Sequence, residues 1–255
     1  MEQYNTIQWE TVEKGLGVLT LNRPKAYNSV NGEMLDELDA FWRMRLYDLE
    51  TVAIILKGAG EKGFCAGLDM KYTVEHAEQF SKPNEFYRFQ ARLGRLNLGM
   101  RRAPQPIIGL IHGAAAGLGF SFALASDIRI VSPDARFCAA YINIGLGGAD
   151  MCCSYLLPRI IGAGRAYEIM YLGEFLSAEE AMKLGMISRV VPREDLYSTG
   201  LQIARTMLTK NHLALRLTKE AINMNLDAGG MEQALNIEDR NQTLIALVSG
   251  IKQTV

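Results

Sequence analysis

Short apolar runs, each too short for a buried helix, recur along the first half of the chain and alternate with longer segments of helical pattern. They occupy residues 52–56 and 107–111, and residues 128–131 return as a further strand. Continuous apolar runs of this length are typical of strands that are buried on both faces of a sheet. Alternating strands and helices predict an α/β core.

Further local signals complete this core. Residues 7–11 and 18–21 have the pattern of two strands around a glycine-containing turn. Asn31 is a favoured N-cap for a helix that runs to Tyr47. A second helix is expected to begin at residues 83–84 and to end near residue 100. The apolar side chains of the first helix fall on one face, and they are Met34, Leu35, Leu38, Phe41 and Trp42.

The second half of the chain has a different character. From Asp150 onward helical patterns dominate, and one strand, at residues 187–191, interrupts them. We therefore expect two units. Residues 1–192 form a core domain that holds the ligand site, and residues 193–255 form a C-terminal helical subdomain.

Composition excludes several classes of function. The chain has 27 Lys and Arg residues against 28 Asp and Glu residues, so charge gives no reason to expect nucleic acid or an anionic membrane as a partner. Its four cysteines do not follow the spacing of a metal site, and no metal is expected. Free thiols and the lack of a long apolar segment predict a soluble protein of a reducing compartment, the cytoplasm.

One glycine pattern suggests a nucleotide site, but its context argues against it. Residues 58–63 match G-x-G-x-x-G directly after a strand. Gly67 interrupts the helix that should follow, and residues 75–79 do not resemble the second strand that should carry an acidic residue. A nicotinamide cofactor is therefore not expected.

Two other clusters of small residues make better physical sense. Residues 64–69 and 113–119 each lie between a buried strand and a short helix. Small residues allow a ligand to approach the main chain, and a helix N-terminus leaves amide protons unpaired. Two such amides converging on one oxygen would form an oxyanion hole. Spacing alone supports close helix–sheet packing equally well.

Motifs along the whole chain resemble those of the enoyl-CoA hydratase/isomerase (crotonase) family. They are Leu21–Ala26, Phe64–Asp69, Ile111–Gly119, Ala123–Asp127 and Leu184–Pro192. The resemblance implies the crotonase (ClpP-like) fold, a spiral of stacked β-β-α turns with a C-terminal helical trimerisation region. It also implies an acyl-CoA thioester substrate, no separate cofactor because coenzyme A is carried by the substrate, and a homotrimer or dimer of trimers.

The resemblance assigns roles to individual positions. It implies that the amides of Ala66 and Leu118 form the oxyanion hole. The Lys25-Ala26 turn and the loop of Ala66, Gly67 and Leu68 would border the CoA nucleotide. Lys25 is a candidate phosphate contact, or else an ordinary surface lysine.

The chain departs from the family at the two glutamates with which hydratases activate water and protonate the substrate. Ser121 and Tyr141 stand at those positions. Neither hydroxyl is an effective base near neutral pH without a partner. Ordinary two-glutamate hydration is therefore not expected, and Tyr141 is assigned to the substrate pocket, as a hydrogen-bond partner or a wall.

One acid, Asp150, lies where dienoyl-CoA isomerases carry a catalytic aspartate and a chlorobenzoyl-CoA dehalogenase its nucleophile. Local sequence favours a helix N-cap there as well. A single proton-shuttling carboxylate suits double-bond isomerisation best, and hydration by a modified acid/base set is an alternative. Two rival functions are an aromatic acyl-CoA hydrolase or dehalogenase that uses Asp150 as nucleophile, and a non-catalytic acyl-CoA binding protein.

Overall fold

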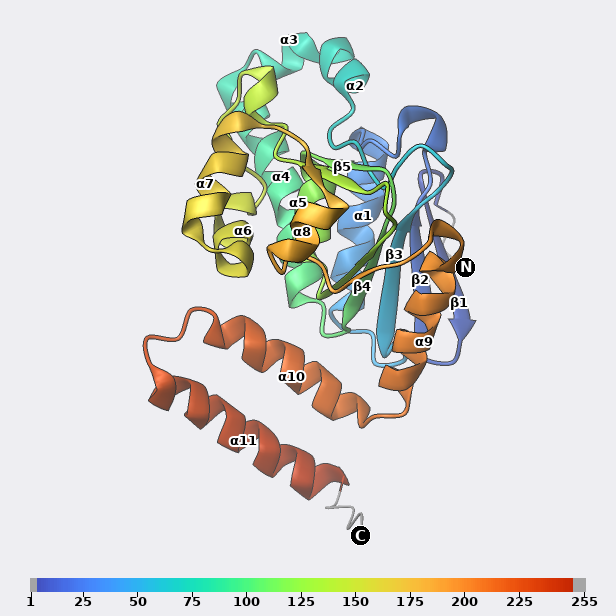
Figure 1. Cartoon of the computed structure of the whole chain (residues 1–255), viewed down its shortest axis with the longest axis vertical. Coiled ribbons are helices and arrows are strands. Elements are labelled where there is room, and N and C mark those ends of the chain that lie inside the picture. Colours follow the sequence, from blue (N-terminus) through green and yellow to red (C-terminus); the bar gives the residue numbers. More distant parts are fainter. Residues whose placement is uncertain (1–3, 250–255) are drawn as a thin grey trace.

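The computed structural model of the protein describes residues 4–249, and a six-stranded sheet lies at its centre (Figure 1). Along the sheet the order is β1 (Ile7–Glu13), β2 (Leu16–Leu21), β3 (Ala53–Gly58), β4 (Ile107–Ile111), β6 (Ile128–Val131) and β9 (Arg189–Val190). β1 and β2 form an antiparallel hairpin, and the remaining neighbours pair in parallel. The α/β fold is confirmed.

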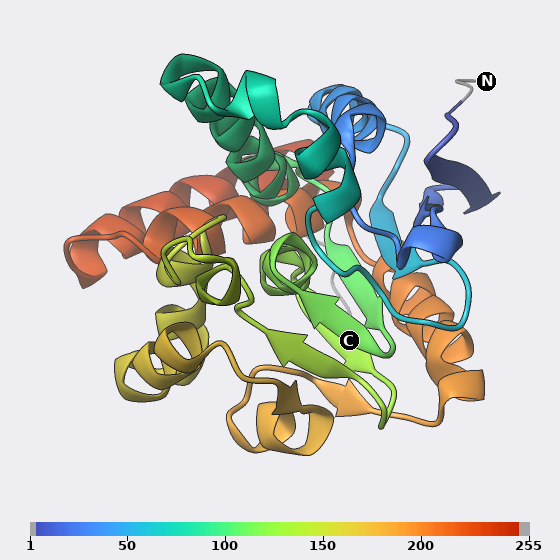
Figure 2. The ribbon, with the colours of Figure 1, turned by 90° about the horizontal axis from the view of Figure 1, so that it is seen from above.

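Helices cover both faces of this sheet (Figure 2). On one face lies α9 (Leu196–Leu208), and on the other lie α1 (Gly32–Arg45), α4 (Pro83–Arg102) and α5 (Leu118–Ala125). Side chains of a strand alternate between faces. Accordingly Ile54 joins the cluster of α1, α4 and α5, whereas Ile55 joins that of α9.

A second, three-stranded sheet connects the core to the next helices. Its order is β5 (Ala114–Ala116), β7 (Arg136–Cys138) and β8 (Leu176–Ser177). The short elements beside these sheets are η1 (Pro24–Ala26), α2 (Met70–Glu75), α3 (Ala77–Phe80), η2 (Ile142–Ile144), α6 (Cys153–Ile161), α7 (Ala163–Leu172), α8 (Ala178–Lys183) and η3 (Arg193–Asp195).

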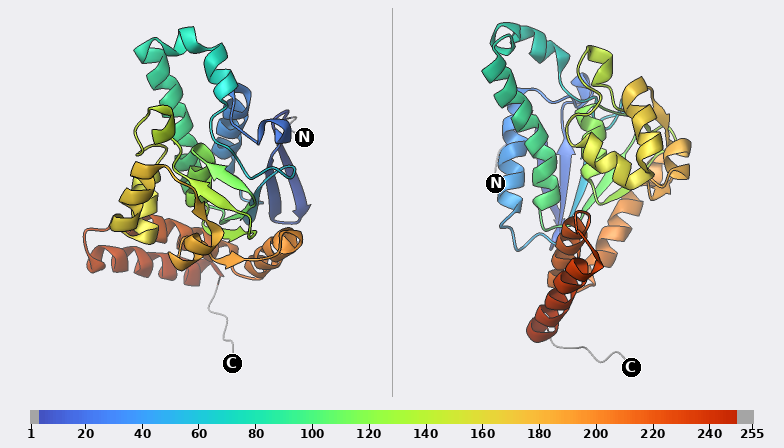
Figure 3. Two further views of the ribbon diagram at one scale, coloured as in Figure 1. Left: turned by 45° about the horizontal axis from the view of Figure 1, so that its top comes forward. Right: turned by 90° about the vertical axis from the view of Figure 1, so that its left-hand side faces the viewer.

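A hairpin of two helices, α10 (His212–Asn225) and α11 (Met231–Ser249), extends away from the sheets (Figures 1 and 3). Lys219 attaches it to the core. This side chain is 6% exposed, and its Nζ donates to the carbonyls of Met100 (3.1 Å) and Gln105 (2.9 Å) and pairs with Asp127 Oδ2 at 2.9 Å. All three ammonium protons therefore have acceptors, as a buried lysine requires.

The predicted division of the chain at residue 192 falls before α9. This helix packs on the sheet, whereas the hairpin that follows it stands apart. The division stays a prediction, and its outer ends, residues 1–3 and 250–255, lie outside the described residues. In the stretch from residue 4 to 249, no helix is both long enough and apolar enough to cross a bilayer.

Candidate active site

Residues 63–69 form the last part of the connection from β3 to α2, and several of their backbone N–H groups donate hydrogen bonds. The N–H of Cys65 donates to Ala114 O (3.1 Å), and that of Asp69 donates to Val30 O (3.0 Å). The N–H of Ala66 donates to Tyr27 O at 3.0 Å. The expectation that the Ala66 amide is free to bind a ligand is therefore wrong.

An amide of this loop that donates no hydrogen bond to the described residues lies two residues further along, at Leu68. Leu68 forms a parallel bridge with Val30, in which Gly67 O and Asp69 N make the hydrogen bonds. The N–H of Leu68 lies between these two groups and on the other side of the strand, because backbone groups alternate. Across residues 4–249 it has no acceptor.

A second free amide lies at Leu118, the first residue of α5. The first N–H groups of a helix have no acceptor within the helix. The N–H of Leu118 also has no acceptor elsewhere in the described chain. Gly117 precedes it with φ 52° and ψ −122°, a conformation that favours glycine. Its own N–H donates to Cys138 O at 2.9 Å.

The two loops touch at Gly67, so the two free amides belong to one site. A Cβ atom at Gly67 would lie 3.2 Å from Leu118 N and 2.7 Å from Ala116 O, and φ here is 94°. Any side chain at this position would displace the second loop. Both free N–H groups follow a glycine with positive φ, and together they can stabilise negative charge on a ligand oxygen.

A buried asparagine holds the first loop in place, and sequence reasoning did not single it out. Asn28 is fully buried with φ 54°, and its Nδ2 donates to Ala59 O (2.9 Å) and Gly63 O (3.0 Å). Arg23 pairs with Asp69 at 2.8 Å. Burial alone would raise the pKa of Asp69, but the Arg23 guanidinium and two backbone N–H groups outweigh it and lower this pKa below its usual value.

Ser121 and Tyr141 lie in contact with each other beside Gly117. Ser121 is fully buried and Tyr141 is 5% exposed. The Tyr141 hydroxyl donates to Gly117 O at 2.7 Å and is hydrogen-bonded to Ser121 Oγ. Burial raises the pKa of Tyr141 well above its usual value, and the carboxylate of Asp150 adds to this effect. Tyr141 is therefore a neutral phenol near pH 7.

One carboxylate oxygen of Asp150 accepts two hydrogen bonds, and the other accepts none from the described residues. Its Oδ1 accepts from Gln90 Nε2 (2.6 Å) and from Met151 N (2.8 Å). Its Oδ2 has no donor among the residues that the structure describes. The N-cap alternative is wrong, because α6 begins at Cys153 and its N-cap is Cys152, in a left-handed conformation with φ 64°.

Helix α4 positions the segment that carries Asp150. Gln90 and Asn97 are seven residues apart and so lie on one helical face. Gln90 holds the carboxylate, and Asn97 Nδ2 donates to Met151 O at 3.1 Å. No local pattern marks Gln90 in the sequence, because its partner lies 60 residues away.

Replacing Gln90 by leucine is expected to lower kcat about tenfold, because a hydrogen bond to a charged group contributes roughly 1.5–3 kcal/mol and Asp150 would lose its side-chain donor. Steady-state kinetics on an acyl-CoA thioester, the substrate class that the resemblance implies, measures this effect. Gln202→Leu, at an exposed position of α9, is the control and should leave kcat unchanged. Wild-type kcat in the Gln90 variant would contradict the assignment of Gln90.

The predicted CoA-binding turn is a single 3-10 turn, η1, which contains Lys25 and Ala26. The Lys25 side chain is exposed. At Tyr27, the residue that follows this turn, Lys62 Nζ lies 4.7 Å from the ring centre. Two lysines at the edge of the first loop provide positive charge for an anionic ligand group.

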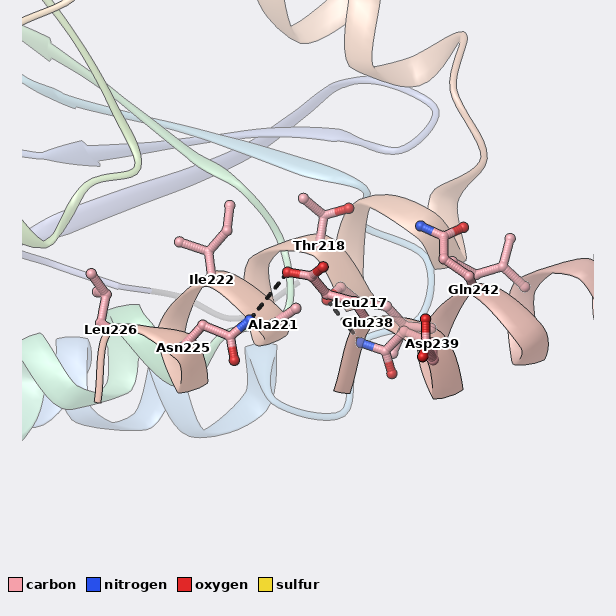
Figure 4. A pocket seen from close by; sticks show the side chains of 11 residues that line it. Leu217, Thr218, Ala221, Ile222, Asn225, Leu226, Glu238, Asp239 and Gln242 are labelled. Carbon is pink, nitrogen blue, oxygen red and sulfur yellow. Dashed lines mark hydrogen bonds between the residues drawn. The ribbon is translucent and has the colours of Figure 1, made fainter. Parts of the chain in front are cut away.

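A separate groove of 590 Å³ lies between α10 and α11 (Figure 4). Asn225 Nδ2 donates to Glu238 Oε1 across it at 3.4 Å. None of its lining residues belongs to the predicted site. It is a feature of the helical hairpin.

Comparisons with known proteins show which family the chain resembles. The sequence model of a family described as enoyl-CoA hydratase/isomerase matches residues 11–253. A probable enoyl-CoA hydratase of Mycobacterium leprae is 38% identical over 234 residues, which are 91% of this chain and 79% of that protein. A 1,2-epoxyphenylacetyl-CoA isomerase of Escherichia coli is 37% identical over 239 residues, 91% of this chain and 87% of that protein. The crystal structure of an enoyl-CoA hydratase from Bacillus anthracis has a TM-score of 0.90 at 28% identity and covers 96% of this chain and 92% of its own.

Proposed function

The chain belongs to the enoyl-CoA hydratase/isomerase family, and on that premise we propose that it moves the double bond of an enoyl-CoA thioester by means of one carboxylate. One observation carries this proposal. The loops that carry the acceptor-free amides of Leu68 and Leu118 are in contact at Gly67, and the Asp150 carboxylate is close enough to Tyr141 to raise its pKa.

The proposed reaction needs a single proton carrier. The thioester oxygen accepts hydrogen bonds from the N–H groups of Leu68 and Leu118. Asp150 Oδ2 takes a proton from C2 of a 3-enoyl thioester, and the electron pair moves to that oxygen as a dienolate. The carboxylic acid so formed returns the proton to C4, which gives the 2-enoyl thioester and restores the carboxylate. The amides stabilise charge that exists only between the two proton transfers.

Hydration by two glutamates is disfavoured by the groups that replace them. The hydroxyls of Ser121 and Tyr141 are both protonated and bonded to each other. Neither is an anion that could remove a proton from water near pH 7. Tyr141 donates its only proton to Gly117 O, so a hydrogen bond from Tyr141 to the acyl group would require that bond to break.

We propose that Lys25 and Lys62 contact the phosphates of the CoA nucleotide, which would run past Ala26 and the loop of Gly67 and Leu68. Support comes from their place at the edge of the first loop. Lysine binds phosphate as a point charge. No separate cofactor enters this proposal.

We propose that α10 and α11 carry the subunit contacts of a homotrimer or dimer of trimers. Large apolar side chains are exposed along this hairpin, among them Ile222 (56%), Leu235 (52%) and Leu247 (80%). Contiguous exposed apolar surface is typical of contact between proteins.

A panel of CoA thioesters tests the proposed reaction. 3-Enoyl-CoA substrates should be converted to 2-enoyl-CoA without uptake of water, and 2-enoyl-CoA should be hydrated far more slowly. Faster hydration would contradict the proposal. Tight binding with no turnover of any thioester would indicate the non-catalytic alternative.

The nucleophilic alternative uses the same free oxygen, Asp150 Oδ2. It predicts an aryl ester of Asp150 that still carries CoA, if the carboxylate displaces a substituent of the aromatic ring, or an acyl anhydride of Asp150, if it attacks the thioester carbon and releases CoA. Intact-mass measurement during turnover of aromatic acyl-CoA thioesters separates the two reactions, because proton transfer leaves the mass of the protein unchanged.

A further inference from the structure

The carbonyl of Gly117 accepts two hydrogen bonds. One comes from Ser121 N–H at 3.0 Å and the other from the Tyr141 hydroxyl at 2.7 Å. The described chain has no cis peptide, so the N–H of Leu118 lies on the opposite side of the same planar group. Whatever fixes this carbonyl therefore fixes the direction of the Leu118 N–H.

Only one assignment of donors and acceptors is possible for the hydroxyls of Ser121 and Tyr141. A carbonyl oxygen cannot donate, so the single proton of Tyr141 goes to Gly117 O. In the contact between the two hydroxyls, Ser121 must then donate and Tyr141 accept. The Ser121 hydroxyl therefore donates to the Tyr141 hydroxyl, which donates to the Gly117 carbonyl. The peptide group of this carbonyl also carries the Leu118 N–H. Hydrogen bonds in such a series polarise one another.

Gly117 needs restraint of this kind. Its φ of 52° and ψ of −122° belong to a region that glycine enters freely, and glycine resists rotation of its peptide groups less than any other residue. Cys138 O holds its N–H at 2.9 Å, which secures the peptide before it. The peptide after it is secured through the carbonyl, by the α5 backbone and by Tyr141.

We propose that Ser121 and Tyr141 are positioning residues, which aim the Leu118 N–H at the thioester oxygen and strengthen it as a donor. At the positions where hydratases carry two proton-transferring glutamates, these two side chains would instead support the oxyanion hole. This inference rests on the proposed function, because it assigns these side chains a role in stabilising the same enolate.

Kinetics of three variants test the proposal. Tyr141→Phe keeps the ring and removes the hydroxyl, and it should lower kcat about tenfold with KM changed less than twofold, an effect of the size of one hydrogen bond. Ser121→Ala should lower kcat about threefold. The double variant should match Tyr141→Phe, because Ser121 acts through Tyr141. The proposal would be overturned if the two single-variant losses of kcat multiplied in the double variant, or if Tyr141→Phe kept the kcat of the wild type.

The pH dependence separates positioning from proton transfer. If Tyr141 only positions the amide, kcat of Tyr141→Phe should keep the pH profile of the wild type. If Tyr141 were an acid or base, the variant would lose one limb of that profile. Tyr87→Phe, at a position 74% exposed on α4, is the matched control and should retain wild-type kinetics.

Acetoacetyl-CoA provides a readout that is independent of turnover, since its enolate absorbs in the near ultraviolet. The wild-type protein should raise the enolate fraction of the bound ligand at fixed pH, and Tyr141→Phe should reduce this gain severalfold. An equal gain in both proteins would overturn the positioning role and leave the proposed function intact. No gain in the wild type would instead count against the oxyanion hole itself.

Discussion

Replacing Leu118 by proline should lower kcat/KM about 10²–10³-fold, the usual effect of losing one oxyanion-hole donor. Proline has no N–H, and the first position of a helix is the one where a helix tolerates it. Leu118 occupies that position in α5, after a glycine that imposes little restriction on its neighbour. Helix α5 should therefore form, and the ligand should lose one of its two donors.

Two matched changes separate the amide from the side chain at position 118. Leu118 is 2% exposed in the main core, so Leu118→Ala should cost about 2–5 kcal/mol of unfolding free energy, and yet it keeps the N–H. Its kcat/KM should fall much less than that of the proline variant. A backbone ester at this position, introduced with the α-hydroxy analogue of leucine, keeps the side chain and should reproduce most of the loss. Equal losses in Leu118→Ala and Leu118→Pro would assign the effect to packing.

Asp150→Asn should lower kcat about 10²–10⁴-fold, the usual contribution of a general acid–base group. Asparagine has nearly the same shape, and its Oδ1 can still accept from Gln90 and Met151, so the segment should keep its conformation. KM should change little because the carboxylate acts in the proton transfers. Steady-state kinetics gives both values, and full turnover in this variant would show that Asp150 carries no proton.

Chemical rescue adds a positive test of the same assignment. Asp150→Ala leaves a space beside Gln90 in which a small carboxylate can bind. Formate should restore part of kcat in Asp150→Ala and none in Asp150→Asn, where the side chain fills that space. Rescue of both variants, or of neither, would contradict a carboxylate that acts from this position.

Sequence reasoning succeeded where the signal was local. Asn31 caps α1 by accepting from Met34 N, as expected, and the five apolar residues predicted for its inner face are all buried. The strands predicted at residues 107–111 and 128–131 have these bounds in the structure. Capping and the periodicity of apolar residues act within a few residues, so the sequence displays them directly.

The sequence could not reveal pairings between distant segments. β5, β7 and β8 have two or three residues each and are defined only by their partners. The choice between the amides of Ala66 and Leu68 depends on which carbonyls, Tyr27 O and Val30 O, lie beside the loop. Both residues flank Gly67, and nothing local distinguishes them.

The same limit applies to the hydroxyl pair and to Asp150. The sequence identifies Ser121 and Tyr141 as replacements for two glutamates, but their shared contact with Gly117 O requires the segment of Tyr141 to meet the first turn of α5. Asp150 resembles an N-cap locally, yet Met151 and Cys152 adopt positive φ and delay the helix to Cys153. Tertiary contacts from Gln90 and Asn97 override the local preference.

The infrared frequency of a bound thioester carbonyl tests the central claim most directly. Butanoyl-CoA labelled with ¹³C at the carbonyl has no double bond to shift, so its spectrum reports the ground-state complex alone. Two donors at Leu68 and Leu118 should lower the stretching frequency in the wild-type complex below its value in water, and Leu118→Pro should reverse most of that change. A frequency in the wild-type complex equal to that in water would contradict a pair of amides directed at the thioester oxygen.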